Sequence, residues 1–228
     1  MLNFDYFAGC GLGLMFLPQL TIVTEWFHKR LAAATGISVG GSGLGIAAFA
    51  YISNTTMNYL DWKWAMMIMA GLMALCIPFA LTFREPPHKA ALSENLKTEV
   101  SFKAALRETI NFKVLRNPLF AYFVLVNTVA SSVYYVPLIV ASDRVKRSQM
   151  GDSSHGALLM VYYGLINFVA RAASGFLADL PHVNRTFLYG VAITLMGVVV
   201  ALTNFAHSFV LMAWAYVGLG VTDGEWLG

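Results

Sequence analysis

The sequence predicts an all-α integral membrane protein, and three observations support this. Of 228 residues, 58% are hydrophobic and 12% charged, with a mean hydropathy of +0.64. A soluble domain carries about 25% charged residues. Several apolar runs approach or exceed the roughly 20 residues that a helix needs to cross a bilayer. These runs are continuously apolar, whereas strands of a membrane β-barrel alternate over short segments.

The apolar runs predict about seven spanning helices. They occupy roughly residues 5–24, 31–53, 62–83, 118–141, 156–179, 186–207 and 208–222. The first run lacks the basic segment and the small-residue cleavage site of a signal peptide. The last run is short and leads directly into Asp223 and Glu225. We expect both ends to belong to a longer protein.

Glycines in the second run predict close helix packing. Gly36 and Gly40 are four residues apart, and so are Gly41 and Gly45. This spacing allows two helix backbones to approach each other in lipid. A phosphate-binding glycine loop would need a preceding strand and a following helix, a context that the pattern does not supply.

A polar stretch divides the predicted helices into two groups. The predicted domains are 1–83 with three helices, a cytosolic linker at 84–117, and 118–228 with four helices. Within the linker, apolar residues recur every four positions beside Lys103 and Arg107. That pattern predicts a basic amphipathic helix, which either lies on the inner membrane surface or packs beneath the bundle.

The distribution of Lys and Arg predicts the orientation. If the first helix runs inward, ten basic residues lie in cytosolic loops: Lys29, Arg30, Arg84, Lys89, Lys97, Lys103, Arg107, Lys113, Arg116 and Arg185. Four lie outside: Lys63, Arg144, Lys146 and Arg147. This bias favours the inward orientation. The outer cluster at 144–147 is an exception to it.

The composition also argues against several functions. The net charge is only +3, and the basic residues are separated by apolar runs, so no continuous basic face is available for nucleic acid. Cys10 and Cys76 lie in apolar runs and form no pattern of disulfides or metal ligands. The predicted spans contain neither a nucleophile nor paired carboxylates. We therefore expect no enzyme activity, cofactor or metal.

The loop between the first two runs, WFHKRLAAATGISVGG, resembles the signature of the monocarboxylate transporter family, a branch of the major facilitator superfamily. Residues that match it in register are Phe27, Lys29, Arg30, Leu31, Ala34, Gly36 and Gly41. The signature's Tyr, Leu, Ala and Ala are replaced by Trp26, Ala33, Ser38 and Gly40. The segments NPLFAYF and FVARAASGFLAD resemble the family's seventh and eighth helices.

The resemblance implies a fold of twelve helices in two halves, of which this chain supplies helices four to ten. It further implies alternating access, a substrate site between the halves at the midplane, and a plasma-membrane location. Family members often associate with a single-span accessory glycoprotein, which makes such a protein a candidate partner beside the lipid bilayer.

Arg171 is the principal candidate site residue. A central arginine costs about 2.5–3.5 kcal/mol on insertion scales, and intramembrane charges pair or line aqueous cavities. Arg171 lies eight residues before Asp179, about 12 Å along a helix. Its planar guanidinium suits bidentate binding of a carboxylate. We predict that Arg171 faces an aqueous cavity and binds an anion; the alternative is a structural interhelical pair.

Five further residues complete the predicted site. In the family, an aspartate four residues before this arginine takes part in proton coupling, but this chain has Asn167, which does not titrate. Asp223 is a candidate replacement, or else it marks the membrane exit. Lys29, Arg30 and His155 are candidates for gating or coupling; Lys29 and Arg30 also suit a cytosolic anchor, and His155 a solvated loop.

The sequence leaves three functions open. The first is a secondary transporter of small monocarboxylates resembling lactate or pyruvate, with the proton as candidate coupling ion. The second is facilitated transport, without a proton, of aromatic amino acids or bulkier organic acids, which Asn167 favours. The third is a truncated membrane protein that does not transport, because half of a rocking bundle cannot alternate access.

Overall fold

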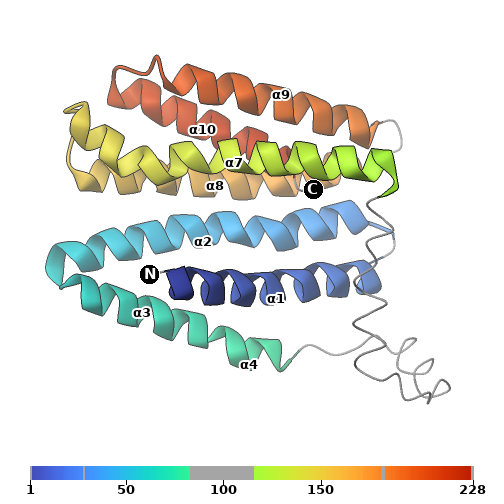
Figure 1. Ribbon diagram of the computed structural model, residues 1–228, viewed down its shortest axis with the longest axis horizontal. Helices are drawn as coiled ribbons and strands as arrows, with labels where there is room; N and C mark the ends of the chain where they lie inside the picture. Colours follow the sequence, from blue (N-terminus) through green and yellow to red (C-terminus); the bar gives the residue numbers. More distant parts are fainter. Residues whose placement is uncertain (1, 28, 83–115, 181–182, 227–228) are drawn as a thin grey trace. The chain divides into compact units, whose positions relative to one another are not determined.

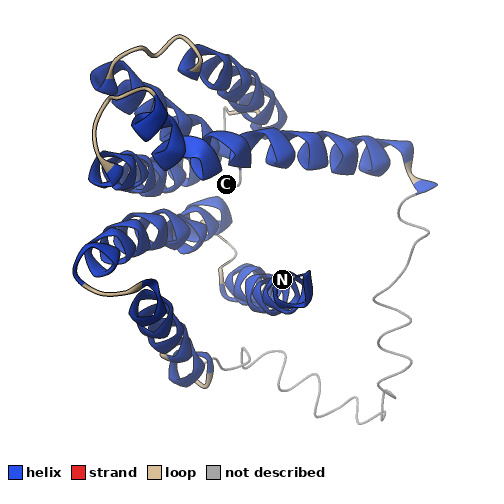
Figure 2. Ribbon diagram, turned by 60° about the vertical axis from the view of Figure 1, so that its left-hand side comes forward, coloured by secondary structure: helices blue, strands red, loops and turns tan. Residues whose placement is uncertain are grey.

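The computed structural model describes residues 2–27, 29–82, 116–180 and 183–226. Within these ranges the regular secondary structure is helical, without strands (Figure 2). Five helical segments are long and apolar enough to cross a membrane: Leu31–Tyr59, Trp62–Ala80, Pro118–Arg147, Ser154–Ala178 and Thr186–Thr203. A shorter apolar helix covers Phe209–Gly224. The predicted class, an all-α multi-pass membrane protein, is confirmed.

Each predicted run contains a helix (Figure 1). The helices are α1 (Leu2–Trp26), α2 (Leu31–Tyr59), α3 (Trp62–Ala74), α4 (Cys76–Ala80), α7 (Pro118–Arg147), α8 (Ser153–Ala178), α9 (Arg185–Thr203) and α10 (Phe209–Trp226). The run at 62–83 is interrupted at Leu75. Pro78 explains the break, because it has no N–H for the carbonyl of Ala74. Helix α10 continues past Asp223 instead of ending before it.

The chain forms two compact units. One contains residues 1–83 and 137–228, and the other contains residues 84–136. In the second unit the structure describes residues 116–136, which include the first part of α7. The predicted linker helix lies outside the described residues. The predicted division into 1–83, 84–117 and 118–228 stays a prediction.

Within the first unit, α8 packs against both α2 and α10, and α10 also packs against α9. The α2–α8 contact depends on glycines. A Cβ added to Gly36 would collide with the carbonyl oxygen of Arg171, and one added to Gly43 would lie 2.6 Å from the carbonyl oxygen of Gly164. Backbones that approach this closely gain dispersion contacts, which drive helix association in lipid.

The glycine prediction is therefore correct for one of the two spacings. Gly36 and Gly40 face α8, and Gly164 and Gly175 of α8 lie against the backbone of α2. A Cβ on Gly41 or Gly45 would meet nothing within 4 Å. The two spacings start five residues apart, about 500° around a helix of 3.6 residues per turn, so they point in different directions.

Candidate functional site

One face of α8 carries a row of buried polar side chains. Tyr163, Asn167 and Arg171 follow at intervals of four residues, and Ser174 comes three residues later, so all four share one side of the helix. Their exposed fractions are 0%, 0%, 4% and 2%. Helix α10 contributes Asp223, which is 1% exposed. The sequence thus places polar groups where the two helices pack together.

These side chains form one hydrogen-bonded network centred on the carboxylate of Asp223. Arg171 Nη2 lies 2.9 Å from Asp223 Oδ2 and forms a buried ion pair with it. The Tyr163 hydroxyl donates to the same oxygen at 2.8 Å, and Asn167 Nδ2 donates to it as well. Asn167 Oδ1 in turn accepts a bond of 2.8 Å from Arg171 Nε. One carboxylate oxygen therefore accepts three donors.

One nitrogen of the guanidinium remains unused. Arg171 Nη1 is buried and has no hydrogen-bond partner among the described residues. A guanidinium offers five N–H donors and never loses its charge in proteins. Leaving a buried donor unsatisfied costs about 1–3 kcal/mol, and more for a charged group. Nη1 can therefore donate to one more acceptor oxygen.

The surroundings of Arg171 differ from the expected ones. Arg171 does not face an open aqueous cavity in this structure, because its side chain is 5% exposed and bonds to Asp223 and Asn167. Asp223 lies inside α10 with almost no exposed surface, and its interpretation as a membrane exit stays a prediction. The sequence does not show that two charges 52 positions apart meet in the folded chain.

Tyr163 and Ser174 are site residues that the sequence did not predict. Ser174 Oγ lies within hydrogen-bonding distance of two carbonyl oxygens, 3.1 Å from that of Arg171 and 2.9 Å from that of Gly224 on α10. Gly224 itself has no room for a Cβ, which would lie 2.8 Å from the Arg171 backbone nitrogen. The sequence does contain a signal for both residues: Tyr163 precedes Asn167 by four residues and Ser174 follows Arg171 by three, which places them on the same side of the helix.

Lys29 and Arg30 lie in a different place from Arg171. They line a cavity of about 450 Å³ together with Phe176, Leu177, Asp179 and Leu180. Asp179 follows Arg171 by eight residues, about 12 Å of helix rise. The structure therefore does not bring these two basic residues to the Arg171 network.

Asp179 binds the beginning of α2. Its carboxylate oxygens accept hydrogen bonds from the backbone nitrogens of Ala32 and Ala33, at 3.2 and 3.0 Å. The first N–H groups of a helix have no partner within the helix, and a negative charge there is favourable. Residues 147 positions apart thus connect the end of α8 with the start of α2.

His155 lies in the first turn of α8 and not in a solvated loop. Its Nδ1 accepts a 3.3 Å hydrogen bond from the backbone nitrogen of Asp152, and its ring meets Phe209 edge-on, with centroids 5.0 Å apart. Gly151 adopts a φ of +147°, and a Cβ there would lie 2.6 Å from this ring. His155 is sixteen residues from Arg171, about 24 Å along the helix, so it is not part of the network.

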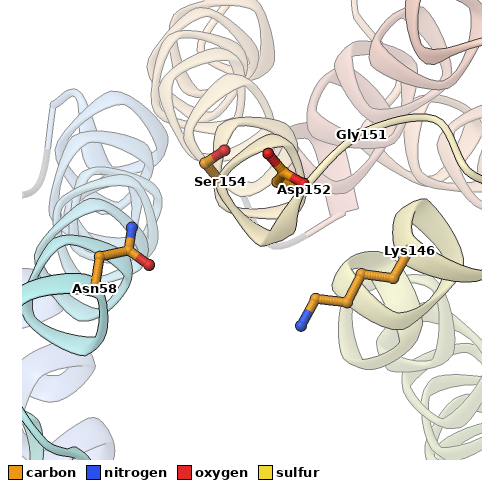
Figure 3. Close-up of a pocket in the computed structure, with 5 residues that line it drawn as sticks. All are labelled: Asn58, Lys146, Gly151, Asp152 and Ser154. Carbon is orange, nitrogen blue, oxygen red and sulfur yellow. The ribbon is translucent and has the colours of Figure 1, made fainter.

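A polar cavity of about 560 Å³ lies near His155. It is lined by Asn58, Lys146, Gly151, Asp152 and Ser154, which come from α2, the end of α7, the loop that follows it and the start of α8 (Figure 3). The outer basic cluster contributes Lys146 to this cavity. Arg147 of the same cluster pairs with Asp143, with 2.7 Å between Nε and Oδ2, in an exposed position.

Among the described residues, no group of three or more His, Cys, Asp or Glu side chains is arranged to hold a metal ion. The expectation that the protein uses no metal or cofactor stays a prediction.

Comparison with known proteins agrees with this architecture. Residues 6–224 match the family model of the Major Facilitator Superfamily. Monocarboxylate transporter 4 of Gallus gallus is 26% identical over 184 residues, covering 80% of this chain and 38% of that protein. Monocarboxylate transporter 3 of Rattus norvegicus is 23% identical, covering 95% of this chain and 44% of that protein. Monocarboxylate transporter 2 of Homo sapiens is 23% identical, covering 96% of this chain and 50% of that protein.

The chain spans half or less of the length of these relatives. The relatives are named as transporters, which agrees with the prediction that this chain is not an enzyme. The predicted resemblance is confirmed, since the family model and the relatives cover most of the chain. The chain belongs to the Major Facilitator Superfamily, and its sequence is similar to those of monocarboxylate transporters.

Proposed function

We propose that the whole protein is a secondary transporter of small monocarboxylates and that Arg171 binds the substrate's carboxylate. The observation that carries this proposal is Arg171 Nη1, a buried charged donor without a hydrogen-bond partner among the described residues. The names of the relatives support the substrate class, since several are monocarboxylate transporters.

A carboxylate would use Arg171 in two steps. One substrate oxygen accepts from Nη1, which requires no existing hydrogen bond to break. The other substrate oxygen then accepts from Nη2, which gives up its hydrogen bond to Asp223. The two outer nitrogens of the guanidinium thus form a bidentate pair with the substrate. Such a pair is stronger and more directional than a single charged contact.

The charge balance of the network connects substrate binding with a proton. Arg171 and Asp223 together are neutral, so a bound anion leaves one uncompensated negative charge in a poorly solvated place. The packed helices α2, α8, α9 and α10 contain few charged or histidine side chains. There are none in α2; α8 contains Arg171 and His155, α9 contains Arg185, and α10 contains Asp223 and Glu225. A proton on Asp223 restores neutrality, so Asp223 takes the coupling role that Asn167 cannot perform.

Two other functions compete with this proposal. Facilitated transport of aromatic amino acids or bulkier organic acids is favoured by Asn167, which replaces an ionisable group with an amide. A membrane protein that does not transport is favoured by the Arg171–Asp223 pair itself, because the two charges satisfy each other without any ligand.

Uptake by cells that express the full-length protein tests the proposal. The probes are labelled lactate, pyruvate and an aromatic amino acid, each at two external pH values and normalised to surface protein. We expect uptake of lactate and pyruvate that increases at the lower pH and loses this dependence in Asp223→Asn. Uptake of the aromatic amino acid alone, independent of pH, would support facilitated transport instead.

Arg171→Lys separates charge from geometry in the same assay. Lysine keeps the positive charge but lacks the planar fork, so we expect a strongly increased KM. Surface labelling of intact cells tests the plasma-membrane location. Recovery of a single-span glycoprotein with the purified protein tests the accessory partner, which is also part of the proposal.

A further inference from the structure

In the proposed binding step, Arg171 Nη2 moves from Asp223 to the substrate. Asp223 is 1% exposed, so water cannot replace the lost bond, and a buried carboxylate without donors is strongly unfavourable. The remaining donors to Asp223 therefore decide how readily Arg171 becomes available to a substrate.

Asn167 is not an independent donor for Asp223. Its amide nitrogen bonds to Asp223 Oδ2, while its amide oxygen accepts from Arg171 Nε at 2.8 Å. A movement of the guanidinium towards a substrate therefore also pulls on Asn167. The amide nitrogen additionally lies 3.4 Å from the carbonyl oxygen of Gly220.

Tyr163 is tied to Asp223 in a simpler way. A phenol has a single proton, and Tyr163 donates it to Asp223 Oδ2 at 2.8 Å. The ring is fully buried, and Gly220 of α10 packs closely on the Tyr163 carbonyl, where a Cβ would lie 2.8 Å from the oxygen. This close packing holds the tyrosine in place when the guanidinium moves.

We infer that Tyr163 is a positioning residue of the transport site, which keeps the carboxylate of Asp223 bonded while Arg171 turns from Asp223 to the substrate's carboxylate. The inference rests on the proposed function. In the substrate-free state Asp223 Oδ2 accepts from Arg171, Asn167 and Tyr163, so the loss of the tyrosine bond is partly compensated. In the substrate-bound state the Arg171 bond is absent, so the tyrosine bond contributes more to that state.

The unequal contribution predicts a specific kinetic result. In Tyr163→Phe, KM for lactate rises by about tenfold while kcat per surface molecule changes little, because the hydrogen bond to Asp223 is lost mainly from the bound state. A tyrosine that only fills space or stabilises the fold would reduce the amount of surface protein and leave KM unchanged. Tyr162→Phe is the matched control, since Tyr162 is the adjacent residue and is 41% exposed.

A binding assay shows whether the effect passes through Asp223. The dissociation constant for lactate is obtained from the ligand-dependent melting temperature of the purified full-length protein. It is measured for wild type, Tyr163→Phe, Asp223→Leu and the double variant, because leucine has a similar size and no acceptor for the tyrosine. We expect Tyr163→Phe to weaken binding about tenfold in the wild-type background and to have little effect when Asp223→Leu is present.

Each outcome has one meaning. An unchanged KM in Tyr163→Phe, with normal lactate uptake by wild type, overturns the inference and leaves the proposed function intact. Equal effects of Tyr163→Phe in both backgrounds also overturn it, because Tyr163 would then act without Asp223. Failure of wild type both to take up and to bind any monocarboxylate overturns the proposed function and, with it, the inference.

Discussion

Two arginine–aspartate pairs of this chain have similar geometry and opposite surroundings. Arg171 and Asp223 lie 2.9 Å apart, with side-chain exposures of 5% and 1%. Arg147 and Asp143 lie 2.7 Å apart, with exposures of 80% and 59%. The first pair joins α8 to α10 across 52 residues, and the second lies within one helix at a spacing of four residues.

The comparison shows that distance alone does not decide what an ion pair contributes. An exposed pair is solvated and screened, and such pairs contribute about 0.3–0.5 kcal/mol at this spacing. A buried pair has lost its hydration, so removing one partner costs about 3–5 kcal/mol by leaving the other charge uncompensated. The buried pair is therefore the one that can control function.

The largest effect should come from Arg171→Ala. It leaves the buried carboxylate of Asp223 without its cation, so we expect a loss of about 3–5 kcal/mol in stability and no measurable monocarboxylate uptake. Thermal unfolding and surface abundance of the full-length protein measure the first effect. Adding Asp223→Asn should restore part of the abundance but none of the uptake. Normal uptake per surface molecule in Arg171→Ala would exclude anion binding by this residue.

The next effect concerns the glycines that bring α2 against α8. Gly43→Ala places a Cβ 2.6 Å from the Gly164 carbonyl and 2.8 Å from the Phe168 nitrogen, so the helices must separate. We expect a cost of about 1–3 kcal/mol from overpacking. Gly41→Ala is the control, because its Cβ would meet nothing within 4 Å. Equal melting temperatures for the two variants would contradict the close α2–α8 contact.

A smaller effect is expected at the junction between α8 and α2. Asp179→Asn keeps an acceptor for one of the two backbone N–H groups but removes the negative charge at the start of α2. The expected loss is about 1 kcal/mol, in the range of helix capping and dipole effects. The measurement is hydrogen exchange at Ala32 and Ala33, which should accelerate. Unchanged exchange at these amides would argue against the contact.

The smallest effect belongs to the exposed pair. Arg147→Gln should change stability by no more than about 0.5 kcal/mol, and this change should decrease as the salt concentration rises. Melting temperatures at low and high ionic strength provide the test. A loss comparable to that of Arg171→Ala would mean that burial is not what distinguishes the two pairs.

Residue types and spacing were sufficient to identify parts of the network. Arg171 stands out because a permanent charge in an apolar run is costly, and Asn167 shares its face because the two lie four residues apart. Tyr163 has the same spacing from Asn167 but was overlooked, since a tyrosine in a membrane span is unremarkable until its hydroxyl has a partner. The sequence allows two interpretations of Asp223, a partner of Arg171 or a membrane exit, because a carboxylate near the end of an apolar run suits both.

Hydropathy and spacing, which are local properties of the chain, determined the helical class, the approximate spans and the presence of a costly charge at Arg171. Only the tertiary structure decided which groups meet that charge. Asp223 is 52 residues away, and Asp179 reaches the start of α2 across 147 residues. Such partners depend on how the helices pack, and packing here follows from glycines whose neighbours belong to other helices. A pattern along one helix shows which side is polar, but not which residue of another helix that side will contact.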